Sequence, residues 1–307
     1  MGRNQRLIAF AWRAGVIAFA LVGWALFAWT FLAYWPGAGY DAHTYWRAAQ
    51  ELVAGRSPYS GAYGGLEGFR YAPPLAILFA PAAALSFDGF KVVMVAVNVV
   101  ALRYAVGSWR WAGIMIVNPI VLHQLYLANV NLPIAAALYS AFRTSSGPLA
   151  LAGLAKLSPF LVLPQLARSG RRLTPFALWL AGAGVLTLPA LWLWPAWITA
   201  LLATETPAGT LPFPFLPRLV LALALLAVAW YRRSDWVAAL AAAIAVPVLW
   251  ASTIVILLAP ARLLLEEWRA RRSVAQPTIG DESRLPATPS AAAILRSWRF
   301  RPRTPPG

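Results

Sequence analysis

Apolar runs follow one another along almost the whole chain, and Gly, Pro or charged residues separate them at short intervals. Charged residues make up only 12% of the sequence and hydrophobic ones 60%, whereas an ordinary soluble domain carries about 25% charged residues. Because a helix needs about 20 apolar residues to cross a bilayer, these runs predict an all-α, multi-spanning membrane protein with about ten transmembrane helices. The predicted helices cover roughly 13–35, 73–87, 89–107, 110–127, 130–143, 148–167, 173–194, 216–231, 235–249 and 251–265.

Two of these runs, 73–87 and 130–143, are short for a perpendicular crossing, so they are expected to tilt into the protein, join a neighbour or be partly re-entrant. We expect residues 1–265 to form one membrane domain. The composition then changes, and residues 266–307 form a basic, Pro-rich tail with too little apolar area to fold alone. This tail is predicted to be cytoplasmic and largely disordered.

The formal charge of +16 comes from Arg residues that lie mostly in loops and at the two ends of the chain. This distribution indicates membrane topology and contact with anionic lipid headgroups, so nucleic acid is not an expected partner. The absence of cysteine excludes disulfides, Cys-ligated zinc and thiol catalysis. His43 and His123 are the only histidines, too few for a typical His-based metal site, so no metal site or cofactor is predicted and a need for a divalent ion stays open.

Basic residues also predict the orientation in the membrane, because Lys and Arg favour the cytoplasmic side. With ten helices, four Arg clusters fall on one side, which puts both termini in the cytoplasm. The expected location of this multi-pass protein is a bacterial inner (plasma) membrane. The same count leaves Arg103, Arg110 and Arg143 on the opposite side. The clusters are Arg3, Arg6 and Arg13; Arg168, Arg171 and Arg172; Arg232 and Arg233; and Arg262, Arg269, Arg271 and Arg272.

A polar, aromatic-rich stretch, residues 36–72, follows the first predicted span and would lie outside the cytoplasm. Within it, residues 41–54 have the pattern of a short helix on the membrane surface, with Asp41 at the N-cap position and Gly55 as the stop. Its apolar side comprises Tyr45, Ala48, Ala49 and Leu52. A carboxylate just outside the hydrocarbon region keeps its charge cheaply, so Asp41 is where we expect chemistry.

Short motifs follow Asp41 in order along the chain. They are Tyr45, then Gly55-Arg56-Ser57-Pro58-Tyr59, then Tyr71-Ala72-Pro73 at the entry to the next helix. A second block runs through Asn118-Pro119, Asn129-Val130-Asn131 and Ala155-Lys156-Leu157-Ser158-Pro159. These motifs, which cover about the first half of this chain, resemble the opening and the middle section of glycosyltransferase family 87, membrane mannosyltransferases of the C-type fold that use polyprenyl-phosphate sugars. The second half of the chain carries no motif of that family.

The resemblance implies a C-type glycosyltransferase-like domain over residues 1–265 and a hexosyltransferase activity. A sugar, with mannose as the expected one, would move from a polyprenyl-phosphate donor to a lipid or glycan acceptor on the extracytoplasmic side, with inversion at the anomeric carbon. Asp41 would be the general base that takes the proton from the acceptor hydroxyl.

Cations and hydrogen-bonding groups are expected around Asp41, since the departing phosphate must be stabilised. Arg56 and Arg70 would meet the phosphate at the outer end, and Lys156 is an ionisable group inside an apolar run, which makes it a functional candidate. Glu67 lies in a Gly-rich run from which it could approach Asp41. The expected substrate-binding residues are His43, Tyr45, Arg56, Tyr59, Glu67, Arg70, Tyr71, Asn129, Asn131 and Lys156.

Each of these assignments has a simpler interpretation. Asp41 can serve only as a helix N-cap, Arg56 and Arg70 can anchor the protein at lipid headgroups, and Lys156 can extend to the nearest interface. At the level of the whole chain, the alternative is a transporter or flippase for a lipid-linked or amphipathic solute, with Lys156 and the Asn129–Asn131 break along its pathway. An inactive scaffolding relative is the third interpretation.

Overall fold

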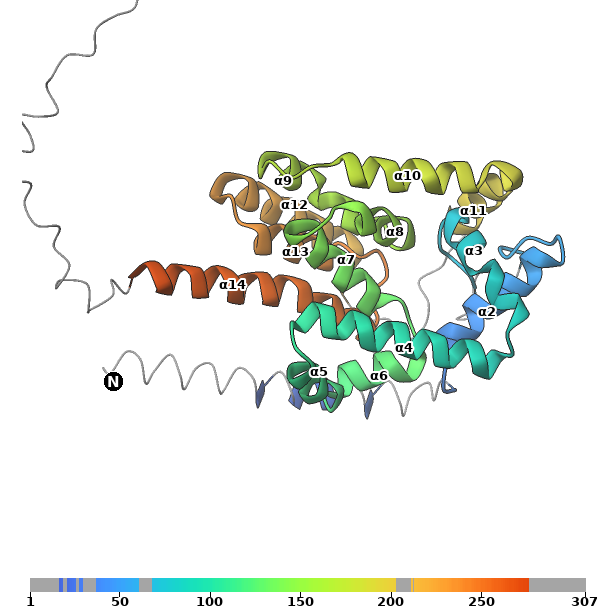
Figure 1. The fold of residues 1–307 in the computed structure, drawn as a ribbon, viewed down its shortest axis with the longest axis horizontal. Coiled ribbons are helices and arrows are strands. Elements are labelled where there is room, and N and C mark those ends of the chain that lie inside the picture. Colours follow the sequence, from blue (N-terminus) through green and yellow to red (C-terminus); the bar gives the residue numbers. More distant parts are fainter. Residues whose placement is uncertain are drawn as a thin grey trace, which may run out of the picture. The chain divides into compact units, whose positions relative to one another are not determined.

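The computed structural model describes residues 17–18, 21–25, 28–29, 37–60, 68–202, 211 and 213–275, and the structural statements below concern these residues. The chain divides into two compact units, residues 1–264 and 265–307. The first unit is built from helices that run back and forth between two ends (Figure 1). In the second unit, residues 265–275 continue helix α14.

The prediction of an all-α protein is confirmed, since no strand occurs in the described part of the chain. Short 3-10 helices (η) join several of the α-helices. The elements are α2 (Tyr40–Val53), α3 (Pro73–Phe79), η1 (Ala80–Ala84), α4 (Phe87–Val106), α5 (Trp109–Ile116), α6 (Pro119–Leu127), α7 (Asn131–Arg143), α8 (Gly147–Ala155), η2 (Ser158–Val162), α9 (Leu163–Arg168), α10 (Thr174–Leu186), η3 (Leu188–Ala190), α11 (Leu193–Leu202), α12 (Phe215–Arg232), α13 (Asp235–Ile244), η4 (Ala251–Leu257) and α14 (Leu258–Ala275).

Two described helices, α4 and α12, are long and apolar enough to cross a membrane, and the bent pair α6–α7 is a third if it counts as one span. The prediction of about ten spans is therefore not confirmed. The apolar runs are present as helices, but Pro and polar residues divide several of them into short pieces. Pro119, for example, begins a new helix inside the run 110–127. Most of the first predicted span, 13–35, lies outside the described residues.

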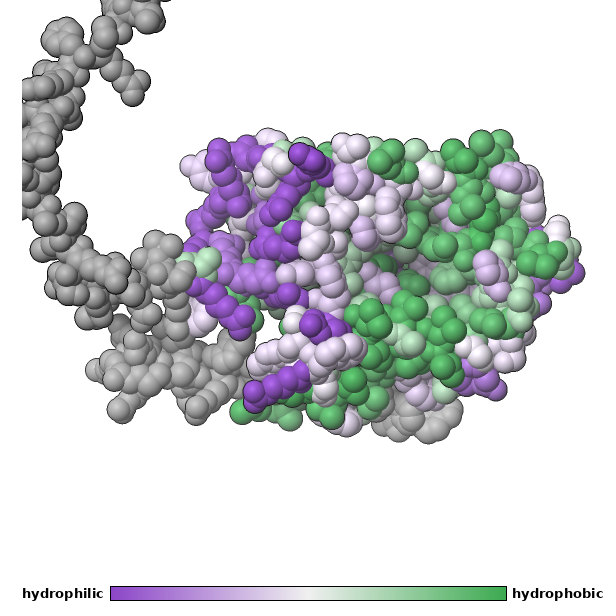
Figure 2. Space-filling view, viewed as in Figure 1, coloured by the Kyte–Doolittle hydropathy of each residue, from purple (hydrophilic) through white to green (hydrophobic). Residues whose placement is uncertain are grey.

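The Arg-rich connections of the first unit meet at one end of the helices. Arg143, which ends α7, donates from Nη1 to the Oδ2 atom of Asp235 at 3.0 Å, and Asp235 begins α13. Ser169, which follows α9, donates to the other carboxylate oxygen of Asp235 at 3.3 Å. Arg262 of α14 donates to the carbonyl oxygen of Tyr104, near the end of α4. Figure 2 shows hydrophilic surface crowded over α9 and the end of α12. We call this region the basic end; its cations are Arg103, Arg110, Arg143, Arg168, Arg171, Arg172, Arg232, Arg233 and Arg262.

This arrangement shows that the predicted placement of Arg103, Arg110 and Arg143 is wrong. The sequence count set them opposite the other Arg clusters, whereas the structure places them among those clusters. One cause is the run 148–167, which was counted as one crossing. It is a hairpin, because α8 leads away from the basic end to Lys156 and η2 with α9 lead back to it.

The run 73–87 is the other cause of the miscount. It forms α3 and η1 and stays beside α2, since the Leu85 carbonyl at its end accepts a hydrogen bond from Trp46 Nε1 at 2.9 Å. Helix α4 begins at this place and ends at the basic end. Its 20 residues span about 30 Å, at about 1.5 Å per residue. Helix α2 therefore lies at the end of α4 that is opposite to the basic end.

Small residues let the helices of the core approach closely. Helix α13 buries Ala238, Ala239 and Ala242, and it packs against α12 and η2. The long helices turn large apolar side chains outward, with exposed fractions of 65% for Val92 on α4 and 70% for Leu216 on α12. Hydrophobic residues cover much of the face drawn in Figure 2. Exposed apolar surface on this scale is suited to lipid rather than to water.

Candidate functional site

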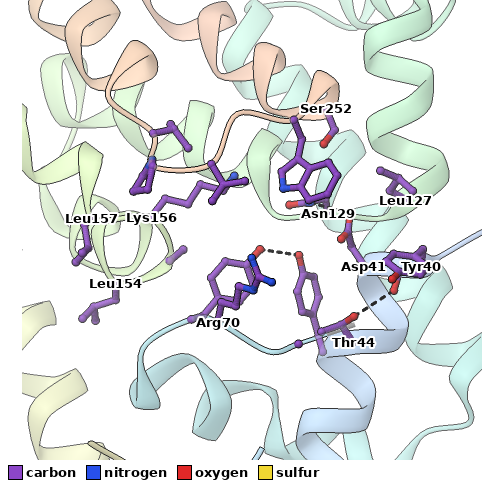
Figure 3. Close-up of a pocket in the computed structure, with 18 of the residues that line it drawn as sticks. Tyr40, Asp41, Thr44, Arg70, Leu127, Asn129, Leu154, Lys156, Leu157 and Ser252 are labelled. Carbon is purple, nitrogen blue, oxygen red and sulfur yellow. Dashed lines mark hydrogen bonds between the residues drawn. The ribbon is translucent and has the colours of Figure 1, made fainter. Parts of the chain in front are cut away.

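A cavity of about 380 Å³ lies where several chain turns meet α2 (Figure 3). Three of these turns point away from the basic end: the break between α6 and α7, the tip of the hairpin α8–η2, and the turn between α13 and η4. Helix α11 and the segment before α3 complete the wall. The lining residues are Tyr40, Asp41, Thr44, Tyr45, Gly68, Arg70, Tyr71, His123, Leu127, Asn129, Leu154, Ala155, Lys156, Leu157, Trp197, Leu201, Val246, Pro247, Val248, Trp250, Ala251 and Ser252.

Helix α2 brings Asp41 to this cavity. It starts one residue earlier than predicted, after Gly39, whose φ of 78° lies in the left-handed region that favours glycine. Asp41 is therefore in the first turn and makes no capping bond, so its interpretation as an N-cap is wrong. Gly55, with φ 73°, ends the helix region as predicted. The predicted apolar side is also confirmed, because Tyr45, Ala48 and Ala49 are buried.

The Asp41 carboxylate is held by one strong hydrogen bond, from Asn129 Nδ2 to Oδ2 at 2.7 Å. Asn129 lies in the break between α6 and α7, where the two helices bend by 112°. Burial raises the pKa of Asp41 to about 6, while the Asn129 bond and the charge of Lys156 act in the opposite direction. The residue is only half-buried, because it borders the cavity. A carboxylate in this position is mostly ionised at neutral pH and still basic enough to accept a proton.

Behind Asn129 lies a buried set of amide side chains. Gln124 donates from Nε2 to the Asn129 carbonyl oxygen at 2.6 Å and to Asn98 Oδ1 at 3.3 Å. Its own oxygen accepts a hydrogen bond from Asn131 Nδ2 at 3.1 Å. Asn131, a predicted substrate-binding residue, is thus one layer behind the cavity wall and fully buried.

Tyrosines from α2 and from the segment before α3 form one side of the cavity. The hydroxyls of Tyr45 and Tyr71 are 2.9 Å apart, and Tyr59 donates its hydroxyl proton to the Tyr71 carbonyl oxygen at 2.8 Å. Burial raises the pKa of Tyr71, so its hydroxyl stays protonated and can donate a hydrogen bond. Tyr59 itself is buried in the core and does not line the cavity.

Lys156 occupies the tip of the hairpin formed by α8, η2 and α9. Its ammonium group donates to Thr253 Oγ1 of η4 at 3.4 Å, and its side chain extends into the cavity across from Asp41 (Figure 3). The two legs of the hairpin pack very closely at Gly153. A Cβ atom added there would lie 1.9 Å from the Phe160 ring, so only glycine fits.

Arg70 supplies a second cation to the cavity (Figure 3). Burial lowers the pKa of its guanidinium from the usual value, an effect that leaves the group charged at neutral pH. Its backbone is fixed by Trp197 of α11, whose Nε1 donates to the Arg70 carbonyl oxygen at 3.0 Å. Asp41, Arg70 and Lys156 therefore share one cavity whose remaining wall is largely apolar.

Not every predicted site residue reaches the cavity. His43 is exposed on α2 and packs edge-on against Phe87 at 5.2 Å between ring centroids. Arg56 is exposed and pairs with Glu51 at 2.5 Å. Glu67 lies outside the described residues. The structure thus brings together Asp41, Tyr45, Arg70, Tyr71, Asn129 and Lys156.

The sequence interpretation missed the parts of the wall that α11 and the turn at residues 246–252 contribute. One guanidinium holds this turn in place. Arg218 of α12 donates to the carbonyl oxygens of Ile244, Val246 and Pro247 at 3.0, 2.7 and 3.1 Å. Arg218 belongs to no recognised motif, and its partners are backbone carbonyls, which any sequence supplies. The sequence therefore gave no signal of this role.

The described residues contain no group of three or more His, Cys, Asp or Glu side chains that could hold a metal ion. Comparisons with family models, with curated proteins and with solved structures found no match to this chain. The arrangement of the cavity is therefore the basis on which its function is inferred.

Proposed function

We propose that this protein is a membrane glycosyltransferase that moves a sugar, expected to be mannose, from a polyprenyl-phosphate donor to a lipid or glycan acceptor. The supporting observation is that a carboxylate, Asp41, and two cations, Arg70 and Lys156, face one cavity with apolar walls. An anionic head attached to a hydrocarbon chain matches this combination. The volume of about 380 Å³ is within the range of about 300–1,000 Å³ found for small-molecule sites.

The reaction assigns one task to each charged group. Asp41 takes the proton as the acceptor hydroxyl oxygen forms its bond to the anomeric carbon. The bond between that carbon and the phosphate oxygen breaks, and the electron pair leaves with the polyprenyl phosphate, inverting the anomeric centre. Arg70 and Lys156 stabilise the charge that develops on the phosphate. A phosphate leaves without added protonation, so a second carboxylate is not required.

The distribution of charge supports an orientation with the basic end in the cytoplasm and the cavity toward the outer side. Helix α7 connects the two regions, from Asn131 beside the cavity to Arg143 at the basic end. Its 13 residues span about 20 Å, at about 1.5 Å per residue. The cavity would then lie between the middle of the bilayer and its outer face, where a lipid-linked sugar can enter from the side.

The test is transfer from radiolabelled polyprenyl-phosphate mannose by the full-length protein in liposomes. Asp41→Asn should insert and fold but lose transfer, because the amide cannot accept the proton. The matched control is Asp88→Asn, since Asp88 is an exposed carboxylate on α4 that pairs only with Lys91 among the ion pairs of the described residues. Full activity of Asp41→Asn would refute the assignment.

Transport of an amphipathic solute is the second candidate, and the bent helix pair α6–α7 favours it. Vesicle uptake separates the two functions. Movement of the labelled lipid without formation of a new glycosidic bond would support transport, and bond formation without movement would support transfer.

A further inference from the structure

We propose that Asn129 is a positioning residue that aims the Asp41 carboxylate into the cavity, and that Gln124 is the residue that keeps Asn129 aligned. This inference rests on the proposed function for its catalytic consequence. The alignment itself is a property of the fold and is tested separately below. Neither residue needs to touch the substrate for this role.

The first step of the argument is the orientation of the Asn129 amide. Its Oδ1 accepts a hydrogen bond from the backbone N–H of Val130 at 2.6 Å, which leaves Nδ2 facing Asp41 Oδ2 at 2.7 Å. If the amide were flipped, its oxygen would face the oxygen of Asp41, and its NH₂ group would face the N–H of Val130. Backbone and side chain therefore select a single arrangement, in which Asn129 donates to the carboxylate.

The second step concerns the backbone of Asn129. The preceding residue, Ala128, has φ 53°, a left-handed conformation that is unfavourable for residues with a Cβ atom. This conformation persists only where neighbouring contacts impose it. Gln124 provides one such contact, since its Nε2 donates to the Asn129 carbonyl oxygen at 2.6 Å.

The third step is that Gln124 cannot turn away at low cost. One Nε2 hydrogen is used by the Asn129 carbonyl and the other by Asn98, while Oε1 accepts from Asn131. Gln124, Asn98 and Asn131 are all fully buried. Rotation of the Gln124 amide would leave several buried polar groups without partners, which is costly away from water. Residues on three helices, α4, α6 and α7, thus fix the position of Asn129, and Asn129 fixes the direction of the Asp41 carboxylate.

Several other polar or titratable groups line the same cavity as Asp41 and contribute to its electrostatic environment. They are Tyr40 and Tyr45 on α2, Arg70 and Tyr71 before α3, His123 on α6 and Lys156 at the hairpin tip. The hydrogen bond from Asn129 Nδ2 to Asp41 Oδ2 fixes the direction of the carboxylate. Because this bond favours the ionised carboxylate, its loss should make Asp41 protonate at higher pH.

The experiment compares Asn129→Leu and Gln124→Met with the intact protein in liposomes. For both variants the acid limb of the pH–activity profile should move toward higher pH, by about one pH unit for Asn129→Leu and by less for Gln124→Met. At pH 6 the ionised fraction of Asp41 would fall from about one half to about one tenth, which corresponds to roughly a fivefold fall in transfer rate for Asn129→Leu. Gln165→Met is the matched control, since Gln165 is equally buried but lies in α9, away from the cavity.

A second readout does not depend on catalysis. The carbonyl band of the protonated Asp41 side chain is followed by infrared spectroscopy during pH titration and is identified by its loss in Asp41→Asn. A shift of this titration in both variants, with none in Gln165→Met, supports the positioning role. Reduced activity with an unchanged titration and an unchanged acid limb would overturn it, since that pattern indicates general destabilisation. If Asn129→Leu does not fold, Gln124→Met and the conservative Asn129→Ser decide by the same criteria.

These readouts keep the two proposals apart. If Asp41→Asn retains full transfer while the infrared titration still shifts in Asn129→Leu, the proposed function fails and the alignment stands. If Asp41→Asn is inactive but neither readout shifts in the variants, the proposed function stands and the positioning role fails.

Discussion

The basic end and the cavity treat charge in opposite ways. At the basic end, cations are numerous and several of them contact aromatic rings: Arg168 lies over the Trp230 ring at 4.4 Å and Arg262 over the Tyr139 ring at 4.0 Å. In the cavity, Asp41 and Lys156 are each placed by one element and one specific hydrogen bond. From this contrast we expect charge at the basic end to act collectively and charge in the cavity to act residue by residue. Substitutions in the two regions should therefore differ strongly in effect.

The largest effect is expected for Asp41→Asn. A general base contributes about 10²- to 10⁴-fold to a rate, so transfer should fall by that factor while the protein remains inserted. Arg171→Gln at the basic end should leave the rate within about twofold, since exposed charges there contribute little singly. Initial rates with labelled donor measure both variants. An equal loss of transfer rate in the two variants would show that a charge in the cavity is no more important for transfer than a charge at the basic end.

Lys156→Met tests the other charge in the cavity. Loss of a charged hydrogen-bond donor to phosphate costs about 1.5–3 kcal/mol, so kcat/KM for the donor should fall roughly 10- to 100-fold. Lys91→Met is the matched control, because Lys91 pairs with Asp88 on α4 and does not line the cavity. An unchanged kcat/KM in Lys156→Met would remove Lys156 from the proposed mechanism.

Gly153→Ala sharpens the comparison by moving Lys156 without altering its charge. The new methyl group would overlap the Phe160 ring, so the hairpin must open, and overpacking of this kind costs about 1–3 kcal/mol. We expect lower thermal stability together with a raised KM. Gly182→Ala on α10 is the control, because beyond the adjacent residues and the backbone of α10 itself no atom lies within 4 Å of the added Cβ. A stable Gly153→Ala protein with an unchanged KM would contradict the tight hairpin.

The pH dependence of stability tests the environment of Asp41. Its pKa rises from an ordinary value of 3.8 to about 6 on folding, so between those values the folded protein binds the proton more tightly than the unfolded chain does. Stability should therefore fall as pH rises from about 4 to 6, by on the order of 1–2 kcal/mol, since water in the cavity reduces the full effect. Thermal unfolding in detergent at each pH measures it. Asp41→Asn should lose this dependence and be more stable at neutral pH; an identical pH profile would show that Asp41 is not desolvated.

The smallest effect is expected at the basic end. Arg168→Gln removes the contact with Trp230, and a cation–π contact at an exposed site contributes about 0.5–1 kcal/mol. The melting temperature should fall by only a few degrees, and transfer activity should not change. A loss of activity comparable to that of Lys156→Met would erase the distinction between the two regions.

Local signals explain what the sequence predicted correctly. The extent of α2 follows from its apolar side and from Gly55. The apolar runs correctly indicated helices over most of their described length, although the run 235–249 leaves the helix after Ile244. The expected site residues came partly from the family resemblance and partly from residue chemistry, which singled out Arg70 and Lys156; the six that line the cavity are Asp41, Tyr45, Arg70, Tyr71, Asn129 and Lys156. The structure places all of these residues in one cavity, although their roles remain a proposal.

Long-range contacts explain what the sequence could not reveal. The bond between Asn129 and Asp41 joins residues 88 positions apart, and no local pattern specifies it. Residues 246–252 are mainly apolar, so their sequence does not distinguish a cavity wall from an ordinary connection between two helices. Hydrophobicity also does not distinguish a crossing from a hairpin of similar length, which is why the run 148–167 was misassigned.

The hairpin that carries Lys156 has a consequence for how the chain is threaded during biosynthesis. A segment that enters and leaves the bilayer on one side transfers no hydrophilic loop across it. The chain before such a segment and the chain after it therefore lie on the same side. Reporter fusions placed just before Gly147 and just after Arg168 should therefore label the same compartment. Every later segment then keeps its sidedness even if this hairpin is deleted.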